Sequence, residues 1–242
     1  MAPLVKRKAR RLLDFTEMAA MDRTVSRSLR GRPVATTHGE IEQAAFRLFA
    51  ERGFERTTLD AIAAETGIGR RTLFRYFESK NDIPWGQFDL TLDGFRTLLE
   101  QMPVDLPLHE AVHRGVVSFN DFEEGAVPSH RERMRLILGT PALQAHSVLR
   151  YAEWRAVISD FVALRTGQRS TDPLPETVSQ VSLALALSAY TLWLRSPGPT
   201  LRDRLDEAMA NLRGYLEHDG PVPRPKKPDL DRSAERGRKE PP

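Results

Sequence analysis

His109, Glu110 and His113 have the types and the spacing of a zinc hydrolase motif. They fit the pattern His-Glu-x-x-His, in which two histidines four positions apart on a helix bind zinc and the glutamate activates a water molecule. A hydrolase also needs a third metal ligand, for which Glu123 or Glu124 is the candidate. Zinc hydrolysis is therefore the alternative hypothesis for this chain. Because no strand pattern is available to hold a substrate, we expect no catalytic residue, no metal site and no cofactor.

A cationic helix favours DNA binding over catalysis. In the segment 70–77, Leu73 and Phe77 are four residues apart and face inward, because residues at this spacing share one side of a helix. Arg70 and Arg71 occupy the first turn, where a recognition helix reaches deepest into the major groove and Arg can bind guanine O6 and N7. The alternative is a charged face that contacts only solvent. The outward residues predicted by this spacing are Arg71, Thr72, Arg75 and Tyr76.

Residues at the rims of this face suit contacts with phosphate, which set register and not sequence. We assign this role to Thr57, Tyr76 and Lys80. The predicted DNA-binding residues are Arg30, Arg32, Thr57, Arg70, Arg71, Thr72, Arg75, Tyr76 and Lys80.

A basic arm precedes these residues. Residues 1–33 contain nine Lys and Arg and three acidic residues and lack a sustained apolar period, so we expect a flexible segment that is attracted to a polyanion. The sequence Arg30-Gly31-Arg32-Pro33 fits a narrow minor groove, whose negative potential attracts Arg. The alternative is a solvated tail without a partner.

The elements that hold the cationic helix form a three-helix module over 34–81. Apolar residues at three- and four-residue steps predict a first helix from Thr37 that ends before Gly53. Thr57 and Asp60 resemble a capping box that opens a second helix, which closes at Gly67. A glycine-bearing turn then leads into the third helix at 70–77. This order of helix, turn and helix is a helix-turn-helix.

The remaining chain is also predicted to be helical, which makes the protein all-α. Prolines separate apolar stretches of helical spacing, and the segment 82–218 forms a second domain. The tail 219–242 is rich in Pro and charge and is expected to be disordered. The predicted helices of this domain are 82–101, 107–124, 129–140, 142–166, 174–196 and 200–217.

Composition excludes several classes of protein. The chain has no cysteine, so disulfides, thiolate metal sites and thiol redox switches are excluded. No apolar run approaches the roughly 20 residues that span a bilayer, and the basic start does not lead into the apolar block of a signal peptide. We therefore expect a cytoplasmic protein without a membrane partner, whose activity is switched by a ligand.

The helix-turn-helix residues resemble the TetR family of regulators. The resemblance runs through Leu48 to Phe54, Thr57-Thr58, Ile62-Ala63, Gly67 to Gly69, Thr72 to Phe77 and Lys80. It implies a sequence-specific DNA-binding transcriptional regulator with a helical ligand-binding and dimerisation domain. Two departures are Phe74, where many relatives have a Tyr that touches phosphate, and Gly69, where many have Ser or Thr. We expect Phe74 to belong to the core instead.

Within this family the chain resembles the regulators of actinobacterial mycofactocin gene clusters. The shared segments are 71–77, 80–82, 85–89, 141–147 and 150–155. This resemblance implies a ligand-responsive repressor of a neighbouring operon, here for mycofactocin biosynthesis.

Two adjacent apolar helices predict a homodimer. Leu183 to Leu194 is apolar on nearly every side, and the next helix carries Leu201, Leu205, Ala208 and Leu212 at helical spacing. Two such helices from each subunit form a four-helix interface, and a dimer suits two half-sites on DNA. Packing within one subunit is the alternative.

Aromatic residues spread over the second domain predict an apolar cavity. The alternative, which we expect for most of them, is ordinary core packing. Family resemblance implies an apolar effector, such as an acyl thioester of coenzyme A (acyl-CoA), and Arg150 and Arg155 are candidates to meet an anionic head. The predicted ligand-binding residues are Trp85, Phe88, Phe119, Phe122, Tyr151 and Trp154, with Phe95 and Phe161 nearby.

Overall fold

The computed structural model describes residues 37–122 and 125–218. The predicted arm with Arg30 and Arg32, the candidate metal ligands Glu123 and Glu124, and the tail 219–242 lie outside these residues. All regular secondary structure in the described part is helical, which confirms the all-α prediction. The described residues from His38 onward cluster as one compact unit.

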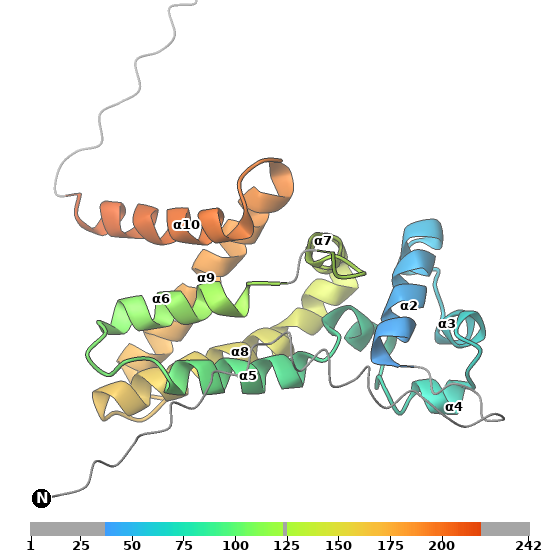
Figure 1. The fold of residues 1–242 in the computed structure, drawn as a ribbon, viewed down its shortest axis with the longest axis horizontal. Coiled ribbons are helices and arrows are strands. Elements are labelled where there is room, and N and C mark those ends of the chain that lie inside the picture. Colours follow the sequence, from blue (N-terminus) through green and yellow to red (C-terminus); the bar gives the residue numbers. More distant parts are fainter. Residues whose placement is uncertain (1–36, 123–124, 219–242) are drawn as a thin grey trace, which may run out of the picture. The chain divides into compact units, whose positions relative to one another are not determined.

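The predicted helix-turn-helix module is present near the N-terminal end of the described chain (Figure 1). It consists of α2 (His38–Arg52), α3 (Leu59–Glu65) and α4 (Arg70–Leu73). Gly53 and Gly67 end α2 and α3 with φ of +83° and +68°, a left-handed conformation that glycine adopts without steric cost. The fully or almost fully buried side chains that join the three helices are Ile41, Ala45, Leu48, Phe49, Ile62, Ala63, Leu73 and Phe77.

Thr58, and not Thr57, caps the second helix. The Thr58 hydroxyl accepts a hydrogen bond from the Ala61 backbone N–H at 3.1 Å, as an N-cap residue does. Thr57 is only 1 % exposed. Its hydroxyl donates to the backbone oxygens of Leu48 and Gly53, at 3.1 and 2.9 Å. The predicted capping box at Thr57 is therefore wrong by one residue.

The recognition helix is shorter than the predicted segment 70–77. After Leu73, the backbone N–H groups of Arg75 and Tyr76 bond three residues back, to Thr72 and Leu73. Such bonds tighten the last turn and end the α-helix. The outward and inward faces predicted from the spacing persist through this turn, because Phe77 returns to the core at 4 % exposure.

The single helix predicted over 82–101 is wrong. The chain forms a 3₁₀ helix, η1 (Lys80–Trp85), and then a separate α-helix, α5 (Phe88–Glu100). Gly86 ends η1 with φ of +59°, a conformation that cannot continue a right-handed helix. The break places η1 between the helix-turn-helix and the second domain.

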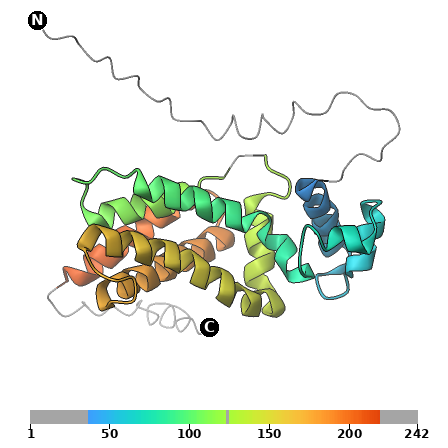
Figure 2. The same ribbon diagram turned by 90° about the horizontal axis from the view of Figure 1, so that it is seen from below.

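The other helices of the second domain agree with prediction within a few residues, except that the helix predicted to reach residue 124 ends at Phe119. They are α6 (Leu108–Phe119), α7 (His130–Gly139), α8 (Pro141–Thr166), α9 (Pro173–Arg195) and α10 (Leu201–Leu216). The long helices α8 and α9 lie side by side, and α10 packs on α9 (Figure 1). Figure 2 shows α5 and α6 as a further pair in the same domain.

Helix α9 is the one element of the described residues that is long and apolar enough to span a membrane. Only 28 % of its most apolar window is buried inside the monomer. Ser182, Ser188 and Thr191 interrupt this helix, so it is apolar on average but contains no uninterrupted apolar run of about 20 residues. Length and composition alone are weak evidence for a membrane span, because core helices share them.

Candidate DNA-binding surface and effector cavity

The face of α4 that was predicted to meet DNA is exposed. Arg70, Arg71 and Arg75 are exposed, and Thr72 and Tyr76 are half-buried. Leu73 on the opposite side is fully buried. Arg70 and Arg71 of α4 and Arg75 of the turn that follows therefore expose three cations to solvent.

Arg70 is held by neighbours on two sides. Its guanidinium lies 3.3 Å from a carboxylate oxygen of Asp60 on α3 and 5.6 Å from the centre of the Phe74 ring. Phe74 is 42 % exposed. The expectation that Phe74 belongs to the core is therefore wrong, and its ring extends the exposed face of the recognition helix.

Thr57 and Lys80 are structural, contrary to their predicted role in phosphate binding. The hydroxyl of Thr57 is buried in backbone hydrogen bonds, as described above. The Lys80 ammonium donates to the backbone oxygens of Phe54 and Thr57 at 2.8 and 3.0 Å and lies 4.3 Å from the centre of the Phe54 ring. Lys80 thus donates hydrogen bonds to carbonyl groups of the turn between α2 and α3.

The His-Glu-x-x-His motif lies on α6, and its residues have other partners. His113 Nε2 is 2.7 Å from an oxygen of Asp206 on α10, and Glu110 accepts a hydrogen bond from Arg114. Within residues 37–122 and 125–218 no group of three His, Asp or Glu side chains is placed to hold a metal ion. Nothing in this geometry favours the hydrolase hypothesis.

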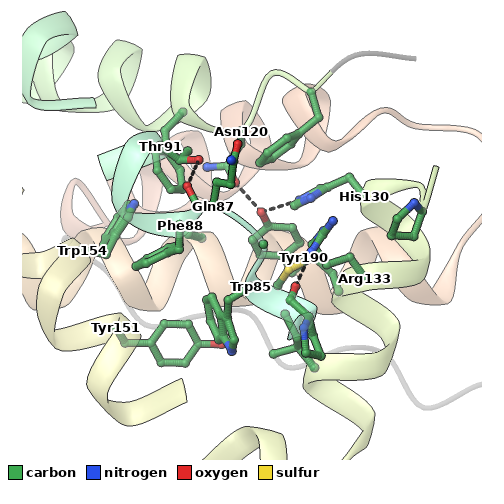
Figure 3. A pocket seen from close by; sticks show the side chains of 18 of the residues that line it. Trp85, Gln87, Phe88, Thr91, Asn120, His130, Arg133, Tyr151, Trp154 and Tyr190 are labelled. Carbon is green, nitrogen blue, oxygen red and sulfur yellow. Dashed lines mark hydrogen bonds between the residues drawn. The ribbon is translucent and has the colours of Figure 1, made fainter. Parts of the chain in front are cut away.

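A cavity of about 370 Å³ opens between η1, α5, α6, α7, α8 and α9 (Figure 3). Its wall is mostly apolar and includes all six residues predicted to bind a ligand: Trp85, Phe88, Phe119, Phe122, Tyr151 and Trp154. Phe95 and Phe161 do not line it. Trp154 is also a core residue, because it is 4 % exposed and its ring stacks on Phe95 at 5.8 Å between centroids.

Sequence reasoning missed the polar wall of this cavity. His130 Nε2 lies 2.8 Å from the Tyr190 hydroxyl. That hydroxyl donates to the side-chain oxygen of Asn120, whose amide nitrogen donates to the Val116 carbonyl at 2.7 Å. The one available signal was Tyr190, a polar tip within the apolar run from Leu183 to Leu194, since a buried Tyr hydroxyl usually has a partner.

Burial and a neighbouring cation keep the polar wall uncharged. Burial, together with the positive charge of Arg133, lowers the pKa of His130 to about 3. Burial raises the pKa of Tyr190, and the nearby Tyr151 adds to the effect. Both side chains are therefore neutral at neutral pH.

Arg133 joins the cavity to the helix-turn-helix module. It donates to the backbone oxygen of Pro84 in η1 at 2.6 Å and to the carboxylate of Glu42 in α2. Glu42 is only 8 % exposed, and both members of the pair line the cavity. This ion pair thus lines the cavity and, through Glu42, includes the first helix of the helix-turn-helix module.

The predicted anion-binding residues lie elsewhere. Arg150 bonds to Asp82, Asp89 and Glu153, and Arg155 donates to Gln180. Neither residue lines the cavity, and both are bonded to other side chains of the protein, so a role for them in binding an anionic head stays a prediction. Arg150 instead links η1 to α8, because Asp82 is part of η1.

Two family models match the chain. Residues 41–83 match the model described as "Bacterial regulatory proteins, tetR family", and residues 106–217 match the model described as "MftR C-terminal domain". The first covers the helix-turn-helix, and the second covers four of the helices that surround the cavity, α6 to α9. The chain belongs to the TetR family. It is a transcriptional regulator, as its sequence motifs predicted.

A curated relative narrows the position of this TetR regulator within the family. The chain is 46 % identical over 178 residues to the "Putative mycofactocin biosynthesis transcriptional regulator MftR" of Mycobacterium tuberculosis, which covers 74 % of this chain and 90 % of the relative. The predicted resemblance to mycofactocin regulators is confirmed.

Solved structures support the TetR fold at lower identity. FadR of Thermus thermophilus in complex with lauroyl-CoA has a TM-score of 0.51 and 22 % identity, over 77 % of this chain and 99 % of FadR. The complex of SmeT with triclosan has a TM-score of 0.50 and 22 % identity, over 80 % of this chain and 100 % of SmeT.

Proposed function

We propose that this regulator is a homodimeric, ligand-responsive repressor, active in the cytoplasm. The observation that carries the proposal is the pair of Glu42 and Arg133, because both residues line the cavity and Glu42 belongs to the DNA-binding module. A ligand in the cavity would therefore lie against a contact on which the position of α2 depends.

The exposed face of α4 is the proposed reading surface for DNA. Arg70 and Arg71 lie in its first turn and suit base edges in the major groove, while Arg75 and Tyr76 suit flanking phosphates. Thr72 adds a hydroxyl donor on the same face. Arg30 and Arg32 of the preceding arm remain candidates for the minor groove.

An apolar molecule is the proposed effector. The six aromatic residues named above line a cavity of a size that suits the apolar part of a small ligand. FadR binds lauroyl-CoA and SmeT binds triclosan, and each of these ligands has a large apolar part. An acyl-CoA is one candidate for this chain.

Two subunits would associate through α9 and α10. Val181 and Leu192 of α9 are 38 % and 37 % exposed, and Leu216 of α10 is 69 % exposed. A second copy of the two helices would cover these apolar groups in a four-helix interface. This explanation also accounts for the apolar exposed part of α9 without a membrane.

The relation to MftR suggests the target. We propose that the regulator represses a neighbouring operon for mycofactocin biosynthesis. The test is binding of the purified protein to the DNA upstream of its own gene and of adjacent genes, followed by anisotropy with lauroyl-CoA. Tight binding that lauroyl-CoA weakens supports the proposal, and equal affinity for these regions and for a scrambled duplex contradicts it.

A further inference from the structure

Three buried polar atoms in the cavity wall have no hydrogen-bond partner. They are Nε1 of Trp85, Nδ1 of His130 and the hydroxyl oxygen of Tyr151, and all three side chains line the cavity (Figure 3). Buried polar groups in proteins are normally paired, because an unpaired group loses its bonds to water without a replacement. The Tyr151 hydroxyl can both donate and accept a hydrogen bond, so the chemistry of the two nitrogen atoms indicates what a cavity ligand offers.

The hydrogen-bond chain fixes which nitrogen of His130 carries hydrogen. Asn120 donates through its amide nitrogen to Val116, so its oxygen is the atom that receives the Tyr190 hydroxyl hydrogen. Tyr190 has then spent its one hydrogen and accepts from Nε2 of His130. In a neutral imidazole only one nitrogen carries hydrogen. Nδ1 of His130 is therefore a lone-pair acceptor, whereas Nε1 of Trp85 is a donor.

The charged groups of the described cavity wall are already paired. Arg133 and Glu42 bind each other, and Arg133 also donates to Pro84. His130 is uncharged, as argued above. A carboxylate or phosphate inside this part of the cavity would find no available cation and would face the lone pair of His130 and the carboxylate of Glu42.

From this geometry we infer that the cavity binds an uncharged, mainly apolar group that donates an N–H or O–H hydrogen to His130 and accepts one from Trp85. This inference rests on the proposed function, because it describes the effector of the same cavity. An amide satisfies both requirements, and an ester satisfies only the second. A ligand with phosphate groups, such as an acyl-CoA, would place only its uncharged part inside.

Three probes with the same twelve-carbon chain test the inference: dodecanamide, methyl dodecanoate and dodecanoate. Their affinities for the full-length protein are measured by fluorescence or calorimetry. Since a neutral hydrogen bond is worth about threefold to tenfold in affinity, dodecanamide should bind about threefold to tenfold more tightly than methyl dodecanoate, and dodecanoate should bind most weakly. Equal binding of amide and ester, tightest binding of dodecanoate, or no binding by any probe would overturn it.

His130→Phe provides the matched variant. The substitution keeps an aromatic ring beside Phe122, whose ring stacks on His130 at 3.6 Å between centroids, but it removes the acceptor. Affinities for amide and ester should then become equal within about twofold. His113→Phe is the control, because His113 pairs with Asp206 outside the cavity, and it should retain the preference. A preference retained in His130→Phe would exclude His130 as the acceptor.

A measurement on the unaltered protein covers the case in which His130→Phe does not fold. In ¹⁵N NMR spectra of the imidazole rings, Nδ1 of His130 should give the signal of an unprotonated nitrogen, which shifts on addition of dodecanamide and not of methyl dodecanoate. A protonated Nδ1 would contradict the hydrogen-bond chain.

DNA binding, measured separately, distinguishes this inference from the proposed function. If dodecanamide binds preferentially and leaves DNA affinity unchanged, the ligand-responsive function fails and the cavity chemistry stands. If all probes that bind weaken DNA binding but amide and ester bind equally, the function stands and this inference fails.

Discussion

Arg133 of α7 and Glu42 of α2 form an ion pair that lines the cavity, and Glu42 also belongs to the first helix of the helix-turn-helix module. Both partners are largely buried, with side-chain exposures of 19 % and 10 %. Removal of one partner from a buried pair leaves an uncompensated charge, which costs more than the pair itself contributes. The pair is therefore suited to transmit a change in the cavity to α2.

A double-mutant cycle tests this coupling. The response to ligand is the ratio of the DNA affinity measured without dodecanamide to the DNA affinity measured with it. We expect Glu42→Gln and Arg133→Met each to lower this ratio severalfold. The ratio in the double variant should be no lower than in the single variant that responds least, because both substitutions remove the same interaction. DNA anisotropy titrations give the ratio. Additive losses, or a ratio that stays at the wild-type value in both single variants, would show that coupling takes another route.

Arg71 and Tyr76 should contribute to DNA binding in different ways. Arg71→Ala should cost about 1–3 kcal/mol on a selected operator duplex and relax the preference for it, because a base contact is lost. Tyr76→Phe should weaken binding to all duplexes alike, since phosphate contacts carry no sequence information. Anisotropy on operator and scrambled duplexes at one salt concentration compares them. Wild-type affinity and preference in Arg71→Ala would exclude α4 as the reading helix.

Lys80 should matter for stability and not for phosphate binding. Lys80→Met removes the donor to the Phe54 and Thr57 carbonyls, so we expect a loss of about 2 kcal/mol in the free energy of unfolding. Urea denaturation measures this loss, and the salt dependence of DNA binding should stay unchanged. Arg75→Met is the control. It should leave stability within about 0.5 kcal/mol but reduce the slope of log affinity against log salt by about 0.9 if Arg75 contacts one phosphate.

His130 should make the protein less stable in mild acid. Its pKa is lowered to about 3 in the folded state from 6.5, so below pH 6.5 the unfolded chain binds a proton that the folded chain does not. The free energy of unfolding therefore has its full value from this group above pH 6.5 and decreases as the pH falls from 6.5 toward 3. Between pH 7.5 and 5 the free energy of unfolding should fall by about 2 kcal/mol from this group.

Denaturant titrations at several pH values measure this dependence in wild type and in His130→Phe. The variant is expected to be less stable near pH 7 but to lose less stability on acidification. Parallel pH profiles for the two proteins would mean that His130 titrates in the folded state as it does in the unfolded chain.

Local patterns in the sequence were sufficient to predict most of the fold. The faces of α4 and the ends of α8, α9 and α10 follow from apolar spacing, proline positions and caps, which act within a few residues. The aromatic lining was predictable for the same reason, since large apolar side chains in a helical domain converge on its interior. These predictions needed no knowledge of how distant segments meet.

Several errors concern contacts between segments far apart in the chain. Lys80 looked like a phosphate ligand because its partners, the carbonyls of Phe54 and Thr57, precede it by more than twenty residues. The partners of Arg150 were not predictable either, because Asp82 was not known to lie beside it. The polar chain from His130 to Asn120 likewise joins α7, α9 and the end of α6.

The break at Gly86 was missed because its neighbours continue an apolar helical pattern.

Gly86 has a genetic consequence. A Cβ atom there would lie 3.0 Å from one carboxylate oxygen of Glu42 and 3.3 Å from Nη1 of Arg133, and the backbone φ of +59° already disfavours any side chain. One added methyl group would therefore press on the same ion pair that a cavity ligand contacts. Alleles with a substitution at this codon should be enriched among mutants that express the target operon without inducer, although position 86 lies outside the recognition helix.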